Sequence, residues 1–193
     1  MKVATIKYNA GNVQSLTFAL NRLGIEPVLT DDPAELAAAD KVIFPGVGEA
    51  STAMNYLKKH RLDQVIRDLK QPFLGVCLGL QLMCKHSEEN DTECLGVFDL
   101  NVKRFNDAEK VPHMGWNTIT NLKGPLFQEI SDESYLYFVH SYFAETSEDT
   151  IATCGYANTF SAALHKDNYY AIQAHPEKSS VTGQKIIENF LAI

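Results

Sequence analysis

The first part of the chain alternates apolar, strand-like runs with amphipathic, helix-like runs. Residues 2–7 predict a short strand, and a helical segment follows it. Its apolar positions keep the spacing of one helix face: Val13, Leu16, Leu20 and Leu23. We expect Asn12 to cap the start of this helix and Gly24 to end it, because these residue types favour those positions. The segment therefore predicts the first half of a β-α-β unit.

The alternation continues as far as residue 76. We expect strands at 27–30, 40–44 and 72–76, and helices at 33–38, 50–58 and 62–70. Strands separated by helices are typical of a parallel sheet whose two faces are both covered by helices.

The pattern changes in the second half. Short strands and turns occupy residues 96–143, and strands at 152–156 and 160–165 precede a final strand at 169–174 and a helix at 182–191. We expect these hairpins to extend one edge of the sheet. The predicted fold is α/β with three layers: a mostly parallel central sheet, helices on both faces and added antiparallel strands. Residues 1–193 fit a single domain.

Composition excludes several classes of partner. The formal net charge is -7, with 17 basic and 24 acidic residues, so no basic surface for nucleic acid or an anionic membrane is expected. The N-terminus is too short and too charged for a signal peptide, and no apolar run approaches the ~20 residues of a membrane span. We therefore expect a cytoplasmic protein. The cysteines at 77, 84, 94 and 154 have no metal-site spacing, so neither a metal, a disulfide framework nor a cofactor is predicted.

The segment 72–83 places a thiol between a strand and a helix. Cys77 follows an apolar strand and precedes an amphipathic helix, where backbone N–H groups and the helix dipole stabilise a thiolate. Gly75 and Gly79 leave room in such a turn. The alternative is that Cys77 is an ordinary buried, unreactive thiol.

Near the C-terminus, His175-Pro176-Glu177 follows a strand-like run. In an extended chain, residues i and i+2 point to the same side, so the imidazole and the carboxylate would project together. Such a pair can act as a general base and the group that orients it. A solvated surface turn is the alternative.

A third segment, Pro45-Gly46-Val47-Gly48, follows the buried strand at 40–44. Backbone N–H groups in such a turn can form an oxyanion hole. They could equally bind a phosphate or simply form a tight loop. In parallel sheets, ligands bind beyond the carboxyl ends of the strands, where all three segments fall.

Together the three segments resemble class I (triad-type) glutamine amidotransferases, and the resemblance covers essentially the whole chain. It implies a flavodoxin-like fold and hydrolysis of L-glutamine to glutamate and ammonia. Cys77 would be the nucleophile, His175 the acid and base, and Glu177 its orienting carboxylate. The implied oxyanion hole comprises backbone N–H groups near Val47 and Leu78, with Gly46 and Gly48 shaping the strand.

The resemblance also implies substrate-binding roles for Gln81, Glu89, Ser141 and Tyr142. Gln81 lies four residues after Cys77, so the two share one helix face. An exposed helix amide at Gln81 and a solvated loop acid at Glu89 are the alternatives.

Within the family, segments 111–117 and 137–142 resemble the glutaminase subunits that serve a cyclase of L-histidine biosynthesis. The first segment carries the only tryptophan and could instead be a core anchor. The resemblance implies an interface and ammonia gate at four residues: Asn12, Pro112, Met114 and Trp116. Relatives usually have an acid where this chain has Lys7, which puts any interface role of that acid in doubt.

The implied partner is a (β/α)₈-barrel cyclase, forming a heterodimer with this chain. The cyclase would use the ammonia to convert a phosphoribulosyl-formimino aminoimidazole carboxamide ribonucleotide into imidazole glycerol phosphate and the aminoimidazole carboxamide ribonucleotide. Two alternatives stay open. One is a glutaminase serving another synthase, of the anthranilate, aminodeoxychorismate, guanylate or carbamoyl phosphate type. The other is a thiol-based stress or binding protein on a related fold.

Overall fold

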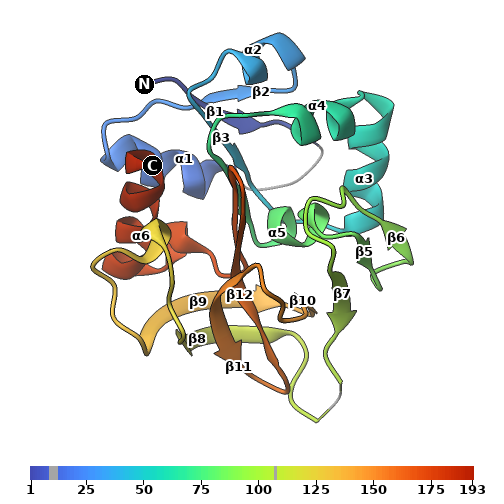
Figure 1. The fold of residues 1–193 in the computed structure, drawn as a ribbon, viewed down its shortest axis with the longest axis vertical. Helices are drawn as coiled ribbons and strands as arrows, with labels where there is room; N and C mark the ends of the chain where they lie inside the picture. The colour runs from blue at the N-terminus through green and yellow to red at the C-terminus, as the bar shows by residue number, and fades with distance from the viewer. Residues whose placement is uncertain (9–12, 107) are drawn as a thin grey trace.

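The computed structural model describes residues 1–8, 13–106 and 108–193 (Figure 1). Within these residues, seven strands form the main sheet in the order β11-β12-β13-β4-β3-β1-β2. Their bounds are β1 (Val3–Ile6), β2 (Val28–Thr30), β3 (Lys41–Phe44), β4 (Phe73–Val76), β11 (Thr150–Gly155), β12 (Thr159–Lys166) and β13 (Tyr169–Ile172). Neighbours from β2 to β13 are parallel, and β12 and β11 continue the sheet antiparallel at one edge. The predicted mixed sheet is confirmed.

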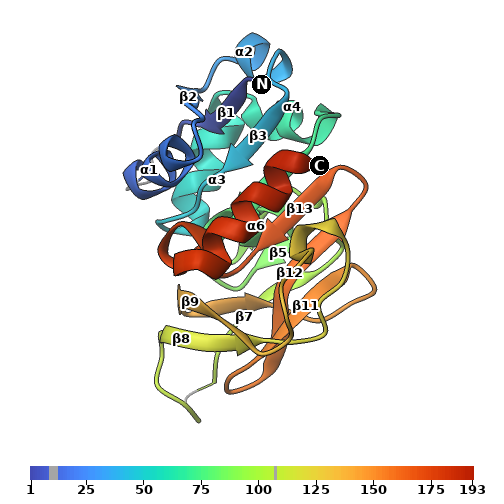
Figure 2. The same cartoon turned by 90° about the vertical axis from the view of Figure 1, so that its left-hand side faces the viewer.

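Helices cover both faces of this sheet (Figure 2). They are α1 (Gln14–Arg22), α2 (Pro33–Ala37), α3 (Ala50–Lys59), α4 (Leu62–Asp68), α5 (Leu78–Met83) and α6 (Ser180–Ala192), with 3-10 turns η1 (Pro125–Phe127) and η2 (Pro176–Lys178). Alternate residues of a strand serve opposite faces: Val42 and Phe44 pack with α3 and α4, whereas Ile43 packs with α1 and α6. The predicted three layers are confirmed.

The hairpin region departs from prediction. Residues 96–143 contribute no strand to the main sheet, although an isolated antiparallel bridge joins Thr120 to Thr153 of its edge strand β11. A four-stranded sheet has the order β10-β7-β5-β6, and β8 pairs with β9 in a separate hairpin. These strands are β5 (His86–Ser87), β6 (Thr92–Glu93), β7 (Asn101–Arg104), β8 (His113–Ile119), β9 (Ser134–His140) and β10 (Tyr142–Ala144).

The β8–β9 hairpin packs through one of its faces. Ile119, Leu136 and Phe138 are completely buried, and the Phe138 ring lies 6.0 Å from that of Phe160 in β12. The hydrophobic effect favours burial of this apolar face against Phe160, which is the physical reason for the departure.

The helix ends lie close to their predicted positions. Gly24, with φ 75°, follows the end of α1 as expected. The cap and interface roles predicted for Asn12 fall outside the described residues. None of the helices in the described part of the chain combines the length and apolar character needed to cross a membrane.

Candidate active site

Cys77 stands at a sharp turn between β4 and α5. Its φ of 52° and ψ of -107° are unusual for a residue with a side chain, and α5 begins directly after it. The Cys77 N–H still donates to the Ile172 carbonyl oxygen at 2.8 Å, so the turn is fixed to strand β13. The thiol is thereby held at the carboxyl edge of the sheet, next to the unpaired N–H groups of the first turn of α5.

Two glycines let the segment after β3 contact this turn. A Cβ on Gly46 would lie 2.4 Å from the Leu78 nitrogen, and one on Gly79 would lie 2.3 Å from the Phe44 carbonyl oxygen. Backbone therefore packs directly on backbone here, and no other residue type fits either position. Gly75 is less confined, because a Cβ there would meet the flexible Met83 side chain at 2.5 Å and the backbone of Gly79 at 2.9 Å.

His175 and Glu177 form a buried pair. Nδ1 of His175 lies 2.8 Å from Oε1 of Glu177, and the His175 side chain is 2% exposed. The predicted extended geometry is wrong: Pro176 begins the 3-10 turn η2, since its fixed φ favours the first position of a helix. The turn still brings the two side chains together.

The charges around His175 favour its protonated form. Burial of the ring lowers the pKa, but the negative charges of the Cys77 thiolate and of Glu177 outweigh it and raise the pKa of His175 to about 10. Nε2 of His175 has no hydrogen-bond partner in the described part of the chain. Because Nδ1 faces Glu177, Nε2 is the nitrogen available for proton transfer.

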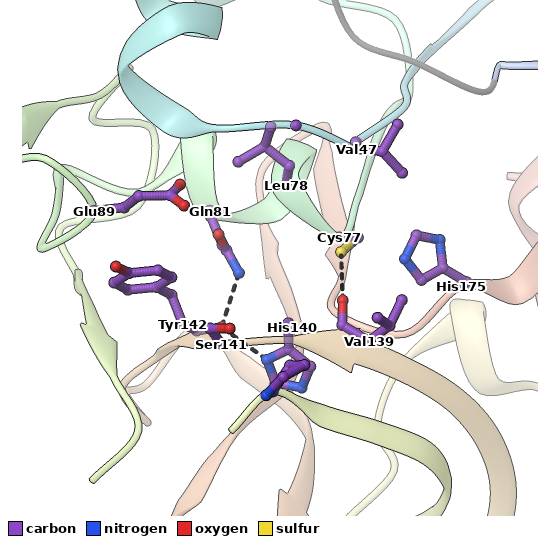
Figure 3. Close-up of a pocket in the computed structure, with 13 residues that line it drawn as sticks. Val47, Cys77, Leu78, Gln81, Glu89, Val139, His140, Ser141, Tyr142 and His175 are labelled. Carbon is purple, nitrogen blue, oxygen red and sulfur yellow. Dashed lines mark hydrogen bonds between the residues drawn. The ribbon is translucent and has the colours of Figure 1, made fainter. Parts of the chain in front are cut away.

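A pocket of about 340 Å³ opens beside Cys77 and His175 (Figure 3). It is large enough for one small molecule. Most of the residues predicted from the sequence lie in its wall, which comprises Gly46, Val47, Gly48, Cys77, Leu78, Gln81, Glu89, Pro112, Val139, His140, Ser141, Tyr142 and His175.

Glu89 is half-buried at the far end of the pocket rather than solvated. Its Oε2 accepts a hydrogen bond of 2.8 Å from the Ala50 N–H at the start of α3. Burial raises the pKa of the Glu89 carboxyl. In Figure 3 the Glu89 carboxylate lies on the same side of the pocket as the Gln81 side chain, so both polar groups line this part of the wall.

Gln81 is buried, not an exposed helix amide. Its Nε2 donates to the Tyr142 carbonyl oxygen at 2.8 Å and to Oε1 of Gln173 at 3.1 Å. Gln173 is completely buried, and its Nε2 lies 3.6 Å from the sulfur of Cys77. Sequence reasoning missed Gln173, although a glutamine directly after a buried strand was a signal available in the sequence.

Tyr8 was also missed. It is 7% exposed, and its hydroxyl donates to the Pro45 carbonyl oxygen at 2.6 Å. Burial, and then the charge on Cys77, raise the pKa of Tyr8, so the hydroxyl keeps its proton. Tyr8 thus orients the peptide that links Pro45 to Gly46.

A buried histidine pair lies behind the pocket. Nδ1 of His113 lies 2.9 Å from Nε2 of His140, and Nδ1 of His140 lies 2.7 Å from the Tyr142 carbonyl oxygen. A carbonyl only accepts, so His140 donates through Nδ1 and accepts from His113 through Nε2. Burial lowers the pKa of His113 to about 4 and that of His140 to about 3, so both rings are neutral near pH 7.

Three of the four predicted interface residues lie in the described part of the chain. Pro112 lines the pocket, whereas Met114 and Trp116 are 58% and 53% exposed on β8. Trp116 is therefore not the core anchor considered as the alternative. Lys7 is exposed, and its Nζ lies 3.9 Å from Oδ1 of Asp31.

The other cysteines differ from Cys77. Cys84, Cys94 and Cys154 are buried and unpaired, and burial raises the pKa of each thiol. Among residues 1–8, 13–106 and 108–193, no three His, Cys, Asp or Glu side chains gather in a way that could hold a metal ion.

Known proteins resemble this chain along its whole length. Residues 6–193 match the family model described as glutamine amidotransferase class-I. A Bacteroides fragilis protein named imidazole glycerol phosphate synthase subunit HisH is 58% identical over the full length of both chains. A protein of the same name from Vibrio parahaemolyticus is 43% identical, covering 100% of this chain and 98% of its own.

Solved structures share the fold. A glutamine amidotransferase from Thermotoga maritima gives a TM-score of 0.68 at 19% identity, over 100% of this chain and 83% of its own. The structure of PurLQS from Thermotoga maritima gives a TM-score of 0.74 at 15% sequence identity, over 99% of this chain and 97% of the other chain. Sequence identities this low show a shared fold alone.

Proposed function

The chain belongs to the class I glutamine amidotransferases and, within them, to the HisH subunits of imidazole glycerol phosphate synthase, and we propose that Cys77, His175 and Glu177 are its catalytic triad. Members of this group are the glutaminase subunits of a synthase in L-histidine biosynthesis. The observation that carries the assignment is the buried His175–Glu177 pair, whose free Nε2 lies on the pocket wall that also holds Cys77.

The proposed reaction has two steps. The Cys77 thiolate attacks the side-chain carboxamide carbon of L-glutamine, and the His175 imidazolium gives its Nε2 proton to the departing ammonia. Glu177 holds the ring through Nδ1 and stabilises its positive charge. Neutral His175 then deprotonates a water molecule, which cleaves the glutamyl thioester and releases glutamate and the thiolate.

Two groups of residues serve this reaction in the proposal. Backbone N–H groups near Val47 and Leu78 bind the oxyanion, and Gly46 and Gly48 give their segment its shape. The substrate's polar backbone lies at the opposite end of the pocket, bound by Gln81, Glu89, Ser141 and Tyr142. The half-buried carboxylate of Glu89 suits an α-ammonium group.

The partner is a cyclase subunit of the synthase, and we extend the proposal to a (β/α)₈ barrel docked on β8. Met114 and Trp116 expose apolar surface there, and Pro112 links that surface to the pocket. Ammonia released into water would be protonated and lose its nucleophilicity, so direct transfer to the partner is favoured. The proposal treats residues 1–193 as one glutamine amidotransferase domain in the cytoplasm, supported by the extent of the family match.

The test compares Cys77→Ala with Cys154→Ala, which alters another buried cysteine. With the cyclase present, Cys77→Ala is expected to abolish synthesis from glutamine and to leave synthesis from ammonium salts intact. Cys154→Ala is expected to retain both. Glutaminase activity of the unsubstituted chain is expected to rise strongly on titration with nucleotide-bound cyclase. Retained glutamine use in Cys77→Ala would contradict the triad, and an unchanged titration would contradict the partnership.

A further inference from the structure

A buried amide contacts the sulfur of Cys77 without having a part in the triad. Gln173 follows β13 and is completely buried, and its Nε2 lies 3.6 Å from Cys77 Sγ. Its backbone N–H donates to the Ala162 carbonyl oxygen at 2.8 Å, so the residue is anchored in the sheet. A buried amide pays a desolvation penalty unless its polar atoms find partners, and here one partner is the sulfur.

The orientation of this amide follows from its neighbours. Gln81 approaches the Tyr142 carbonyl oxygen at 2.8 Å, and because a carbonyl only accepts, the atom facing it is Nε2 of Gln81. The same nitrogen lies 3.1 Å from the Gln173 side chain, so the Gln173 atom facing it is the acceptor Oε1. The other end of the Gln173 amide is then NH₂, and it faces sulfur.

The Tyr142 carbonyl is itself fixed. Besides Gln81, Nδ1 of His140 donates to it at 2.7 Å. The amide of Gln173 therefore has a single arrangement that satisfies every donor and acceptor in the series His140, Tyr142, Gln81 and Gln173.

We propose that Gln173 is a further catalytic residue, whose side-chain amide donates a hydrogen bond to the Cys77 thiolate and is held in that orientation by Gln81. The inference rests on the proposed role of Cys77 as nucleophile. The bond stabilises the thiolate before attack. The same hydrogen bond stabilises the thiolate again when the thioester is hydrolysed, because the thiolate is then the leaving group.

Other groups also face the sulfur and set its charge. His175 directly precedes η2 and Glu177 lies in it, Tyr8 follows β1, and the Val139 carbonyl oxygen on β9 lies 3.9 Å from Sγ. The raised pKa of His175 keeps that ring positively charged near pH 7, and the raised pKa of Tyr8 keeps its hydroxyl neutral. Gln173→Met leaves these groups in place and, unlike Gln173→Glu, adds no charge beside the sulfur, so a change in thiol reactivity in that variant isolates the amide.

Two variants separate donation to sulfur from support of Gln81. Gln173→Glu keeps an acceptor oxygen for Gln81 Nε2 but loses the N–H that faces sulfur, whereas Gln173→Met loses both. Alkylation of Cys77 by iodoacetamide at pH 7 is expected to slow by about tenfold or more in both variants. At high pH the Gln173→Met rate is expected to reach or exceed that of the parent. In complex with the cyclase, both are expected to accumulate the glutamyl thioester, seen by intact-protein mass spectrometry. Gln184→Met, an exposed substitution on α6, is the control.

The proposal would be overturned if Gln173→Glu kept the alkylation rate and the turnover of the unsubstituted chain while Gln173→Met lost both. That result would assign Gln173 a structural role. A second measurement needs no variant: the side-chain amide protons of Gln173 in the full chain are expected to shift on alkylation of Cys77, while those of Gln184 stay in place. An unmoved Gln173 signal would also overturn it. A failure of the proposed catalytic triad would be seen in a different experiment, because the Cys77→Ala variant would then still use glutamine.

Discussion

The hydroxyl of Tyr8 donates a hydrogen bond of 2.6 Å to the carbonyl oxygen of Pro45. The segment after β1 thus holds the segment after β3, and it does so at the peptide that joins Pro45 to Gly46, which packs on the turn at Cys77. The proposed oxyanion segment is therefore fixed from two sides, by a side-chain hydrogen bond and by direct backbone packing.

Removing this hydroxyl should affect turnover more than thiol chemistry. Tyr8→Phe is expected to lower the free energy of unfolding by about 1 kcal/mol and kcat for glutamine by about tenfold, because the Pro45 carbonyl loses its donor and the oxyanion segment loosens. KM and the alkylation rate of Cys77 should change little. Tyr56→Phe is the matched control, since it removes a hydroxyl bonded to Asp31 far from the pocket. Equal kcat values in the two variants would exclude a positioning role for Tyr8.

The carboxylate of Glu177 should matter through its charge. Glu177→Gln keeps a hydrogen-bonding group beside Nδ1 of His175 but removes the negative charge that helps to raise the pKa of His175 to about 10. The pKa of His175 is expected to fall toward its ordinary value, and kcat to fall by about a hundredfold or more. NMR titration of the ring and steady-state kinetics measure the two effects. An unchanged His175 titration would show that Glu177 does not govern the imidazolium.

Trp116 should contribute to partner binding and not to folding. Its side chain is 53% exposed on β8. Trp116→Ala is expected to weaken binding of the cyclase by about thirtyfold or more, as central aromatic residues of interfaces do, with an unchanged melting temperature. Leu29→Ala, an exposed apolar substitution on the edge strand β2, is the control. Calorimetric titration with the cyclase distinguishes them, and equal affinities would place the interface elsewhere.

The buried histidine pair should make the fold sensitive to mild acid. The pKa values of His113 and His140 are lowered to about 4 and about 3, whereas unfolded histidine titrates near pH 6.5. Below about pH 6.5 the unfolded chain binds protons that the folded chain does not, so the free energy of unfolding falls as pH falls. Each ring contributes up to about 1.4 kcal/mol per pH unit in this range.

Urea denaturation between about pH 5 and pH 7 isolates this effect, because most carboxylates titrate lower. A His113→Gln/His140→Gln double variant is expected to show a flatter dependence, while His60→Gln should keep the parental slope. His175 adds little slope below about pH 6, since its raised pKa leaves it protonated in both states there, and its stabilisation is lost progressively as the pH rises from about 6.5 toward 10. A slope that survives in the double variant would point to other groups.

Sequence patterns predicted those elements of the fold that depend on residues close together in the chain. The apolar alternation gave the parallel strands and both helical layers, and the turn at Cys77 follows from a strand, a cysteine and a helix in succession. The separate β8–β9 hairpin was not predicted, because its position depends on face packing between Phe138 and Phe160, which are distant in sequence.

Contacts between distant side chains were equally hidden from the sequence. The hydrogen bonds from Gln173 to Cys77 and from Tyr8 to Pro45 join separate strand ends, and a single polar residue in a strand does not reveal its partner. From the sequence, Glu89 could have been a solvated loop acid. Its hydrogen bond from the Ala50 N–H, which speaks against that alternative, is visible only in the structure. His140 lies in the segment 137–142, which the family resemblance singles out, but nothing in its neighbourhood along the chain marks it as buried.

The contrast among the four cysteines has a practical consequence. Burial keeps Cys84, Cys94 and Cys154 protonated and covered, whereas Cys77 lines an open pocket beside an imidazolium. A mild electrophile should therefore modify this protein at one atom. A fluorescent or affinity reagent attached there would occupy the glutamine pocket, which makes the chain a suitable starting point for covalent inhibitors and for single-site sensors of partner docking.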